Sequence, residues 1–142
     1  MSSLTEDIQR IARCNAQFRA DRLAPYGLKG CHASYLREIC ANPGLSQDKL
    51  AQRICINKSN VARQAAALEE GGFILRRSSP SDKRVIELFP TEKTLALMPE
   101  VNAVLECSET YLTEGMSPEE FETVCRVLER MKQKADTMNE TG

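Results

Sequence analysis

Residues 58–64 read KSNVARQ and carry a cluster of polar side chains, some long and some small. Side chains of these types hold phosphates and also reach base edges in the major groove of DNA. Val61, Ala65 and Leu68 recur at helical spacing, which places the polar residues on the outer face of a helix. The pattern indicates a helix that contacts DNA, without identifying which side chain touches a base. The candidate contacts are Lys58, Ser59, Asn60, Arg63 and Gln64.

A second basic cluster lies in a predicted β-hairpin that follows this helix. Residues 73–77 and 85–89 read as strands, and the turn-rich run SSPSD at 78–82 connects them. Arg84 is expected at the start of the return strand, at the base of the hairpin, from which its guanidinium can enter an adjacent minor groove. Arg76 and Arg77 are expected to contact phosphates or to form salt bridges within the hairpin. For each arginine the alternative is a solvated surface charge, and the basic candidates are Arg76, Arg77, Lys83 and Arg84.

Two helices and a turn must hold the first cluster in place. A short helix is predicted from Ser46 to about Arg53, and Ser46 can cap it because its hydroxyl accepts from backbone N–H groups of the first turn. Residues 55–57 form the turn, and Asn57 or Ser59 caps the second helix. Gly71-Gly72 ends that helix, since glycine tolerates a left-handed backbone.

Helix, turn, longer helix and hairpin in this order form the layout of a winged helix-turn-helix. Residues 46–90 are therefore predicted to be a DNA-reading head, and residues at its two helix caps join the candidate contacts. The alternative is a small α/β unit with a solvated charged hairpin. The candidates at the caps are Ser46, Gln47 and Asn57.

The charge is unevenly distributed along the chain. The formal net charge of −1 at pH 7 does not by itself favour a polyanionic partner. Residues 46–89, however, carry eight Lys/Arg against five Asp/Glu, whereas the remainder carries eleven against fifteen. Because the local field governs phosphate attraction at physiological screening lengths, the basic reading head remains compatible with DNA.

Apolar helical stripes flank the reading head on both sides. Helices are predicted over residues 4–24, from about residue 29 to 40, from residue 91 to about 114, and from 118 onward, with a frayed end after residue 136. One winged domain cannot cover the stripes of the first helix and of the last two. We expect residues 1–24 and 91–137 to form a dimerisation region with a second chain, and residues 29–90 to form the winged helix-turn-helix. A dimer is expected because helix-turn-helix proteins commonly bind the two half-sites of a pseudo-palindromic operator as two-fold pairs. The alternative is a monomeric helical bundle.

Length and composition limit the other possibilities. The 142 residues, 42% hydrophobic and 27% charged, fit one domain, mainly α with a small β-wing. No apolar run is long enough to cross a bilayer and no signal-peptide pattern is present, so a cytoplasmic protein without a membrane partner is expected. No Ser/His/Asp set, phosphate loop or metal cluster is visible, which argues against an enzyme and predicts no cofactor and no metal. A protein-interaction module remains as a competing class, although it would not explain the basic hairpin.

The six cysteines form no C-x-x-C pair, and the single histidine gives little support for a zinc site. In a cytosolic chain these thiols should be reduced. Cys40, Cys55 and Cys125 fall where apolar residues are expected, which predicts that they are small buried hydrophobes.

The run from residue 45 to 93 resembles the MarR family of bacterial transcription regulators. The family's entry-helix motif matches Leu45-Ser46-Gln47 with Leu50-Ala51, and the end of its recognition helix matches Leu68-Glu69 with residues 72–76. Asp82-Lys83-Arg84 matches the D-x-R of the family's wing, which is the most specific part of the resemblance. With Gly27-Leu28 and Tyr35-Leu36 upstream, the resemblance covers nearly the whole chain. It implies a winged helix-turn-helix homodimer that regulates transcription, commonly as a ligand-responsive repressor.

The resemblance also implies roles for residues outside the reading head. Asp82 should pair with a basic side chain and position the wing instead of touching DNA. A small effector should bind between the dimer helices and the reading head, although the residues that would line this cleft could equally be plain core, and His32 stands where the family often has Gln. Some members sense oxidants through a cysteine of the first helix, where this chain has Cys14, but its neighbours lack the pattern of that branch. The candidate ligand residues are Phe18, Arg22, Tyr26, His32, Tyr35 and Met98.

Overall fold

The computed structural model describes residues 1–138, which form seven helical segments and three short strands. The chain divides into two compact units, residues 1–108 and the part from residue 109 onward, which are described separately. The elements in chain order are α1 (Leu4–Leu23), η1 (Ala24–Tyr26), α2 (His32–Ala41), β1 (Leu45–Ser46), α3 (Gln47–Ile54), α4 (Lys58–Glu70), β2 (Ile74–Ser78), β3 (Ile86–Pro90), α5 (Glu92–Leu112) and α6 (Pro118–Met138).

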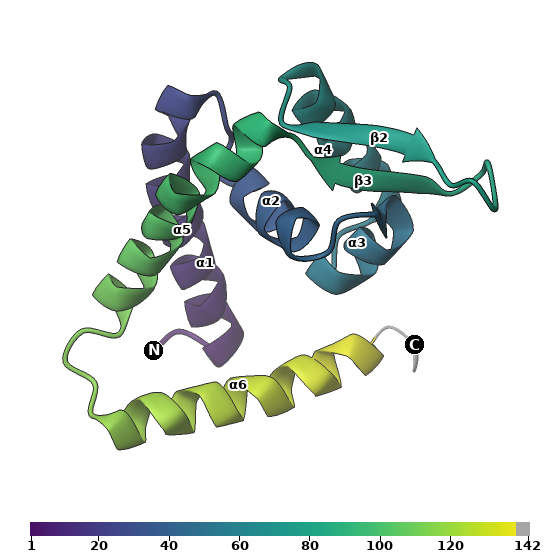
Figure 1. Ribbon diagram of the computed structural model, residues 1–142. Coiled ribbons are helices and arrows are strands. Elements are labelled where there is room, and N and C mark those ends of the chain that lie inside the picture. Colours follow the sequence, from purple (N-terminus) through teal and green to yellow (C-terminus); the bar gives the residue numbers. More distant parts are fainter. Residues whose placement is uncertain (139–142) are drawn as a thin grey trace. The chain divides into compact units, whose positions relative to one another are not determined.

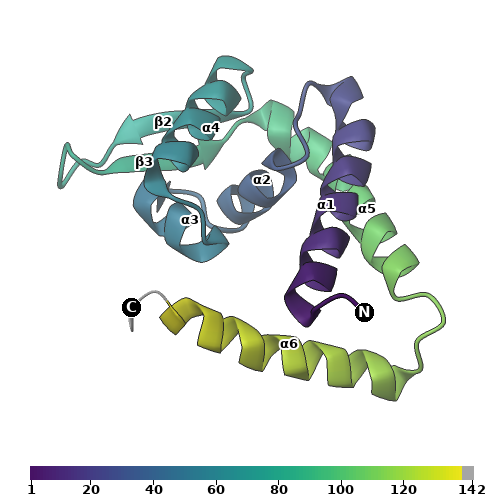
Figure 2. The same ribbon diagram turned by 180° about the vertical axis from the view of Figure 1, so that it is seen from behind.

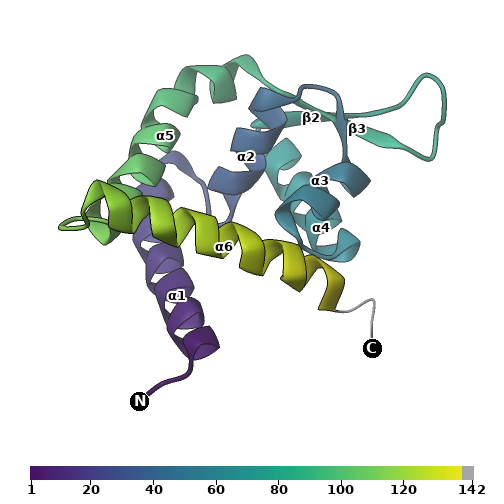
Figure 3. The ribbon, with the colours of Figure 1, turned by 90° about the horizontal axis from the view of Figure 1, so that it is seen from below.

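The predicted fold class, mainly α with a small β-wing, is confirmed. Helices α2, α3 and α4 group together beside the sheet, and the β2–β3 hairpin projects away from them (Figure 1, Figure 2). The view from below shows the same hairpin extending beyond α3 and α4 (Figure 3). This arrangement of three helices followed by a hairpin is a winged helix-turn-helix.

The sheet has one strand more than the predicted hairpin. β1 pairs antiparallel with β3, with Leu45 opposite Leu88, so the strand order is β1-β3-β2. A two-residue strand is too short to show the alternation by which strands are recognised in a sequence. The extra strand ties the entry of α3 to the base of the hairpin.

The core of the first unit lies between the helices and the sheet. Leu36, Leu50, Leu68 and Leu88 are fully or almost fully buried there and come from α2, α3, α4 and β3. Helix α2 buries four residues that form one stripe of the helix. That helix starts three residues later than expected, and its stripe consists of His32, Tyr35, Leu36 and Ile39.

The helix ends follow the predicted local chemistry. Ser46 Oγ accepts from Lys49 N at 3.1 Å and caps α3. Of the two candidate caps for α4, Asn57 is the one used, because its Oδ1 accepts from Asn60 N at 2.8 Å. Gly72 has φ +80°, a left-handed conformation that favours glycine and turns the chain from α4 into β2.

The start of α5 binds the corner that follows α4. Lys93 Nζ donates to Gly71 O at 2.9 Å, and Thr91 Oγ1 donates to Gly72 O at 2.7 Å. Thr94, which is fully buried, donates from Oγ1 to Phe73 O at 2.6 Å. Three consecutive carbonyls after the recognition helix are therefore held by side chains of one helix turn.

Thr94→Val is expected to lower the free energy of unfolding by about 1 kcal/mol, because it keeps the shape and removes a buried hydrogen bond. The effect stays moderate since Phe73 O also accepts from Thr91 N at 3.1 Å. Chemical denaturation measures the change, with Thr113→Val as control: Thr113 Oγ1 donates to Glu109 O at an exposed position. Equal losses in the two variants would contradict a special role for Thr94.

The second unit consists mainly of α6. Ser117 and Glu120 form a reciprocal cap at its start: Glu120 N donates to Ser117 Oγ at 3.1 Å and Ser117 N donates to the Glu120 carboxylate at 3.0 Å. The helix continues to Met138, so the predicted frayed end is wrong for residues 137 and 138, and the rest of it lies outside the described residues. Phe121, Val124 and Leu128 form an apolar stripe that the single chain leaves exposed. No helix within residues 1–138 has the length and apolarity needed to span a membrane.

Candidate nucleic-acid interface

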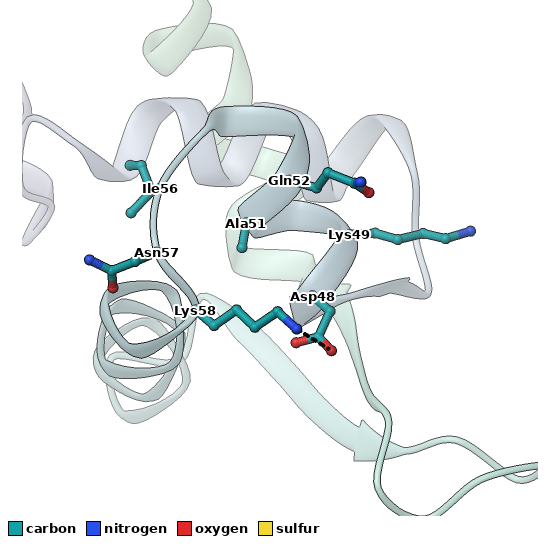
Figure 4. Close-up of a pocket in the computed structure, with 7 residues that line it drawn as sticks. All are labelled: Asp48, Lys49, Ala51, Gln52, Ile56, Asn57 and Lys58. Carbon is teal, nitrogen blue, oxygen red and sulfur yellow. Dashed lines mark hydrogen bonds and ion pairs between the residues drawn. The ribbon is translucent and has the colours of Figure 1, made fainter. Parts of the chain in front are cut away.

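The first turn of α4 meets the start of α3 at an open groove. Lys58 reaches from α4 to Asp48, with Nζ 3.5 Å from Oδ2, and both side chains are largely exposed (Figure 4). The groove has a volume of about 390 Å³ and an apolar floor. Besides Asp48 and Lys58, it is lined by Lys49, Ala51, Gln52, Ile56 and Asn57.

Two polar residues of α3 line this groove and were not among the predicted DNA contacts. Lys49 and Gln52 are exposed, and their side chains extend away from α4 (Figure 4). Their three-residue spacing puts them on one helix face, and that periodicity was the signal available in the sequence. Lys49 and Gln52 extend the polar surface of α4 onto the neighbouring helix.

Arg63 lies one turn further along α4 and contacts Asn60 of the first turn. Arg63 Nη2 donates to Asn60 Oδ1 at 3.4 Å, a long and therefore weak hydrogen bond. Arg63 is exposed and Asn60 is half-buried, whereas Ser59 is exposed on the first turn. This part of the predicted face is thus accessible as expected.

Gln64 departs from the predicted outward orientation. Its Oε1 lies 2.8 Å from His32 Nε2, and the residue is half-buried between α4 and α2. Helical spacing alone predicted Gln64 on the outer face of α4. Gln64 lies at the edge of that face, where the buried imidazole of His32 binds its side chain from α2. Its amide oxygen is therefore directed inward.

Arg76 takes one of the two roles predicted for it, a salt bridge within the wing. Glu69, near the end of α4, accepts from Arg76 N at 3.0 Å and from Arg76 Nε at 3.1 Å. Both side chains are partly buried. This salt bridge ties α4 to β2. Arg77 is exposed and stacks over the Phe89 ring, with 5.0 Å between the guanidinium carbon and the ring centroid.

The position predicted for Arg84 is wrong. β3 begins only at Ile86, so Arg84 lies with Lys83 in the loop at the tip of the hairpin. The reason is local: Asp82 Oδ1 accepts from Arg84 N at 3.0 Å, which bends the backbone into a turn that competes with strand pairing. Val85 N donates to Asp82 O at 3.0 Å and closes this turn.

Asp82 does pair with a basic side chain, and that side chain is Arg84. Arg84 Nε donates to Asp82 Oδ1 at 3.2 Å and Nη2 donates to Oδ2 at 3.3 Å, a two-point contact. The guanidinium lowers the pKa of the Asp82 carboxyl below its usual value. The Arg84 side chain is 91% exposed, so the pair aims the guanidinium at solvent at the hairpin tip.

The cap-side candidates are largely occupied by the backbone. Ser46 Oγ and Asn57 Oδ1 both accept from helix N–H groups, which leaves the Asn57 amide nitrogen exposed to the surface. Gln47 is half-buried, and its buried Oε1 has no hydrogen-bond partner within the described part of the chain. Asn57 therefore retains a donor for DNA, whereas the Ser46 oxygen serves the helix.

The predicted ligand residues fall into separate places. Phe18 and Arg22 stack on α1, with 4.1 Å from the guanidinium carbon to the ring centroid. His32 and Tyr35 are buried edge to face on α2, with ring centroids 6.4 Å apart, and Met98 is buried on α5. Tyr26 is exposed and lines a cavity of about 390 Å³ with Lys93, Ala96, Leu97 and Glu100, which none of the other predicted ligand residues line.

The prediction for the cysteines holds only in part. All six are free thiols, but only Cys40 is half-buried, whereas Cys55 and Cys125 are exposed in the single chain. Cys55 occupies the left-handed C-cap of α3, with φ +57°, and that turn position points its side chain outward. Cys14 is exposed on α1.

Fold and site together define a winged helix-turn-helix protein, and sequence comparison then identifies its family. The MarR family model matches residues 32–86. The uncharacterized HTH-type transcriptional regulator YybA of Bacillus subtilis (strain 168) is 30% identical over 136 residues, which cover 96% of this chain and 91% of YybA. The chain therefore belongs to the MarR family of transcriptional regulators.

Solved structures show the same similarity. A crystal structure of the transcriptional regulator SlyA has a TM-score of 0.91 at 27% identity and covers 95% of each chain. A MarR family transcriptional regulator from Listeria monocytogenes, solved in complex with a 26mer DNA, has a TM-score of 0.90 at 27% identity. The match covers 96% of this chain and 91% of the Listeria protein.

Proposed function

We propose that this transcriptional regulator is a sequence-specific DNA-binding protein that acts in the cytoplasm as a homodimer. The observation that carries the proposal is the exposed polar and basic surface formed by the start of α4 and the tip of the hairpin. Lys58, Ser59, Asn60 and Arg63 supply the part on α4, and Lys83 with Arg84 supplies the part on the wing. The Listeria relative solved with DNA supports the same use of the fold.

In this proposal α4 enters the major groove and the wing reaches the adjacent minor groove. Arg63, exposed one turn into α4, is placed to donate two hydrogen bonds to the edge of a guanine. Lys58 contacts phosphate after leaving Asp48, since that ion pair is exposed and exchanges partners at little cost. Arg84, aimed by Asp82, enters a minor groove whose negative potential is strongest in narrow A·T tracts.

The domain assignment remains part of the proposal. Residues 1–24 and 91–137 form the dimerisation region, and residues 29–90 read DNA. Apolar side chains on α1 and α6 that the single chain leaves exposed support a second copy as their cover. Those on α1 are Leu4, Ile8 and Ile11.

A small effector that releases a repressor from its operator is the proposed control. The buried Tyr35 hydroxyl supports a polar ligand near α2, because within residues 1–138 it has no hydrogen-bond partner. The Phe18–Arg22 stack offers an aromatic face and a cation on α1. No catalytic role is assigned to any of these residues.

Selection of bound sequences from a random DNA pool tests the proposed function. A regulator of this type should enrich an inverted repeat, and its affinity should fall steeply with salt. Retention of no sequence at low salt would favour the protein-interaction module.

Arg63→Ala should weaken binding to the selected duplex by about 1–3 kcal/mol and relax the preference at one position in each half-site.

Lys58→Ala should weaken binding to all DNA sequences alike and reduce the slope of log affinity against log salt concentration by about one unit. Asp48→Asn is the matched control, and its expected effect on affinity is opposite to that of Lys58→Ala. It frees Lys58 from its ion pair and should strengthen binding to any DNA sequence. Titrations of the selected and of a scrambled duplex measure all three, and negligible losses for both cation variants would mean that another face binds DNA.

A further inference from the structure

His32 connects α2 to the recognition helix through both of its ring nitrogens. The side chain is only 4% exposed and lies at the start of α2. Nδ1 accepts from the backbone N–H of Lys29 at 3.0 Å, and Nε2 lies 2.8 Å from Gln64 Oε1 on α4. Each nitrogen has one partner, and the two partners come from different segments of the chain.

These partners define the protonation state of the ring. A backbone N–H can only donate, so Nδ1 must be the unprotonated nitrogen and the ring proton must be on Nε2. Nε2–H then donates to Gln64 Oε1. Burial lowers the pKa of His32 and outweighs the Gln64 hydrogen bond, which raises it, while the charge of Lys29 lowers it further.

The donated hydrogen bond also orients the Gln64 amide. Its oxygen is directed to α2, and the NH₂ group, bonded to the same planar amide carbon, diverges from the oxygen and lies further from His32. A bidentate contact with adenine needs oxygen and nitrogen of the amide on the same base edge. The bond to His32 occupies one of the two lone pairs of the amide oxygen and turns that oxygen toward α2, which disfavours the adenine contact. The NH₂ group remains free to donate, to a purine N7, a guanine O6 or a phosphate oxygen.

We propose that His32 is a positioning residue for DNA recognition: it engages the Gln64 oxygen so that the recognition helix offers the Gln64 NH₂ as a hydrogen-bond donor at this position. The inference rests on the proposed DNA-binding function and adds a determinant of specificity to it. His32 itself does not touch DNA in this assignment.

The surroundings make this link sensitive to acid. The charged groups near His32 and its neighbour Tyr35 are cationic: Lys29 lies in the preceding loop and Arg63 on α4. Burial raises the pKa of Tyr35, and the charge of Arg63 lowers it in part. Burial also raises the pKa of the nearby Cys31 thiol, which is therefore uncharged. A second proton on His32 would point Nδ1–H at the Lys29 N–H and break one of the two bonds.

The sign of the pH effect follows from the lowered pKa. Between the folded-state pKa and the ordinary value of 6.5, the unfolded chain binds more protons than the folded one. The stability that neutral His32 contributes is therefore present above pH 6.5 and is lost as the pH falls from there toward the folded-state value. Once the folded protein takes up the proton, repulsion between Nδ1–H and the Lys29 N–H should displace the ring, and base discrimination through Gln64 should weaken.

A double-mutant cycle on a duplex selected by the wild-type protein tests the assignment. His32→Met removes the donor and should reduce discrimination at one base pair of each half-site by on the order of fivefold. Gln64→Met should do the same, and the double variant should lose no more than either single variant. His32→Gln should rescue discrimination at pH 7.5, since its amide can donate to Gln64, and should abolish the loss that the wild type shows when the pH falls below the folded-state pKa of His32.

Additive losses, or discrimination that survives His32→Met, would overturn the inference while leaving DNA binding intact. Failure of the wild type to select any sequence would instead reject the proposed function. If His32→Met does not fold, NMR of the wild type still tests which ring nitrogen of His32 carries the proton. The chain has one histidine and therefore one set of imidazole signals. A proton on Nε2 alone at pH 7.5 supports the inference, and a proton on Nδ1 contradicts it.

Discussion

Removal of residues 117–142 is expected to destroy the homodimer and to lower operator affinity by on the order of a hundredfold or more, because two linked half-site contacts become independent. The reason is the apolar stripe of α6, whose side chains Phe121, Val124 and Leu128 are 40–42% exposed in the single chain. A dimer that loses this cover either dissociates or unfolds. Light scattering and titration of the selected duplex measure both results.

A point variant separates loss of the helix from loss of its apolar face. Replacing Phe121, Val124 and Leu128 together by Asp should reproduce the truncation in the full-length chain. The matched control replaces three exposed charged residues off the stripe, Glu122, Arg126 and Glu129, by Ser. A truncated chain that is folded, monomeric and still binds the operator at full strength would refute the dimer.

Arg84→Ala is expected to weaken binding by about 1.5–3 kcal/mol on sites with A·T-rich flanks, the range for hydrogen bonds to charged groups. On G·C-rich flanks the loss should be smaller, since a wider minor groove attracts the guanidinium less. Lys83→Ala is the matched control, because Lys83 occupies the same turn without the contact to Asp82, and it should weaken both sites equally. Equal losses of Arg84→Ala on both flanks would contradict insertion into the groove.

Asp82→Ala gives a prediction whose sign distinguishes two roles. Removal of a negative charge would strengthen DNA binding if Asp82 were only a surface acid. Asp82 accepts three hydrogen bonds from Arg84, one from its backbone and two from its guanidinium, so its loss should release the arginine and open the turn. We therefore expect weaker binding to the selected duplex, and a rise in affinity would reject the positioning role.

The sequence predicted best those features that depend on neighbouring residues. Ser46 and Asn57 cap their helices as expected, because a cap needs only a side chain and N–H groups two or three residues away. The family membership followed equally from local motifs. The two-residue strand β1 was missed because its partner, β3, lies about forty residues further along the chain.

Side-chain pairing across the fold was the part that spacing could not predict. Arg76 and Gln64 both belong to faces that look solvent-exposed by periodicity, yet Glu69 binds one and His32 the other. The Gln64–His32 bond joins residues 32 positions apart. Helical periodicity places a residue on a face of its own helix, but it carries no information about which neighbouring helix approaches that face.

The hydrogen bonds from Thr91, Lys93 and Thr94 to the corner at residues 71–73 have a mechanical consequence. A joint held at three successive carbonyls is stiff, so a tilt of the first turns of α5 is passed to the end of α4 instead of being absorbed by the loop. In a two-fold dimer such a tilt, repeated in both copies, changes the separation of the two recognition helices. The preferred half-site spacing on DNA is then set at this corner, and an effector that moves α5 can retune it without touching any base-contacting side chain.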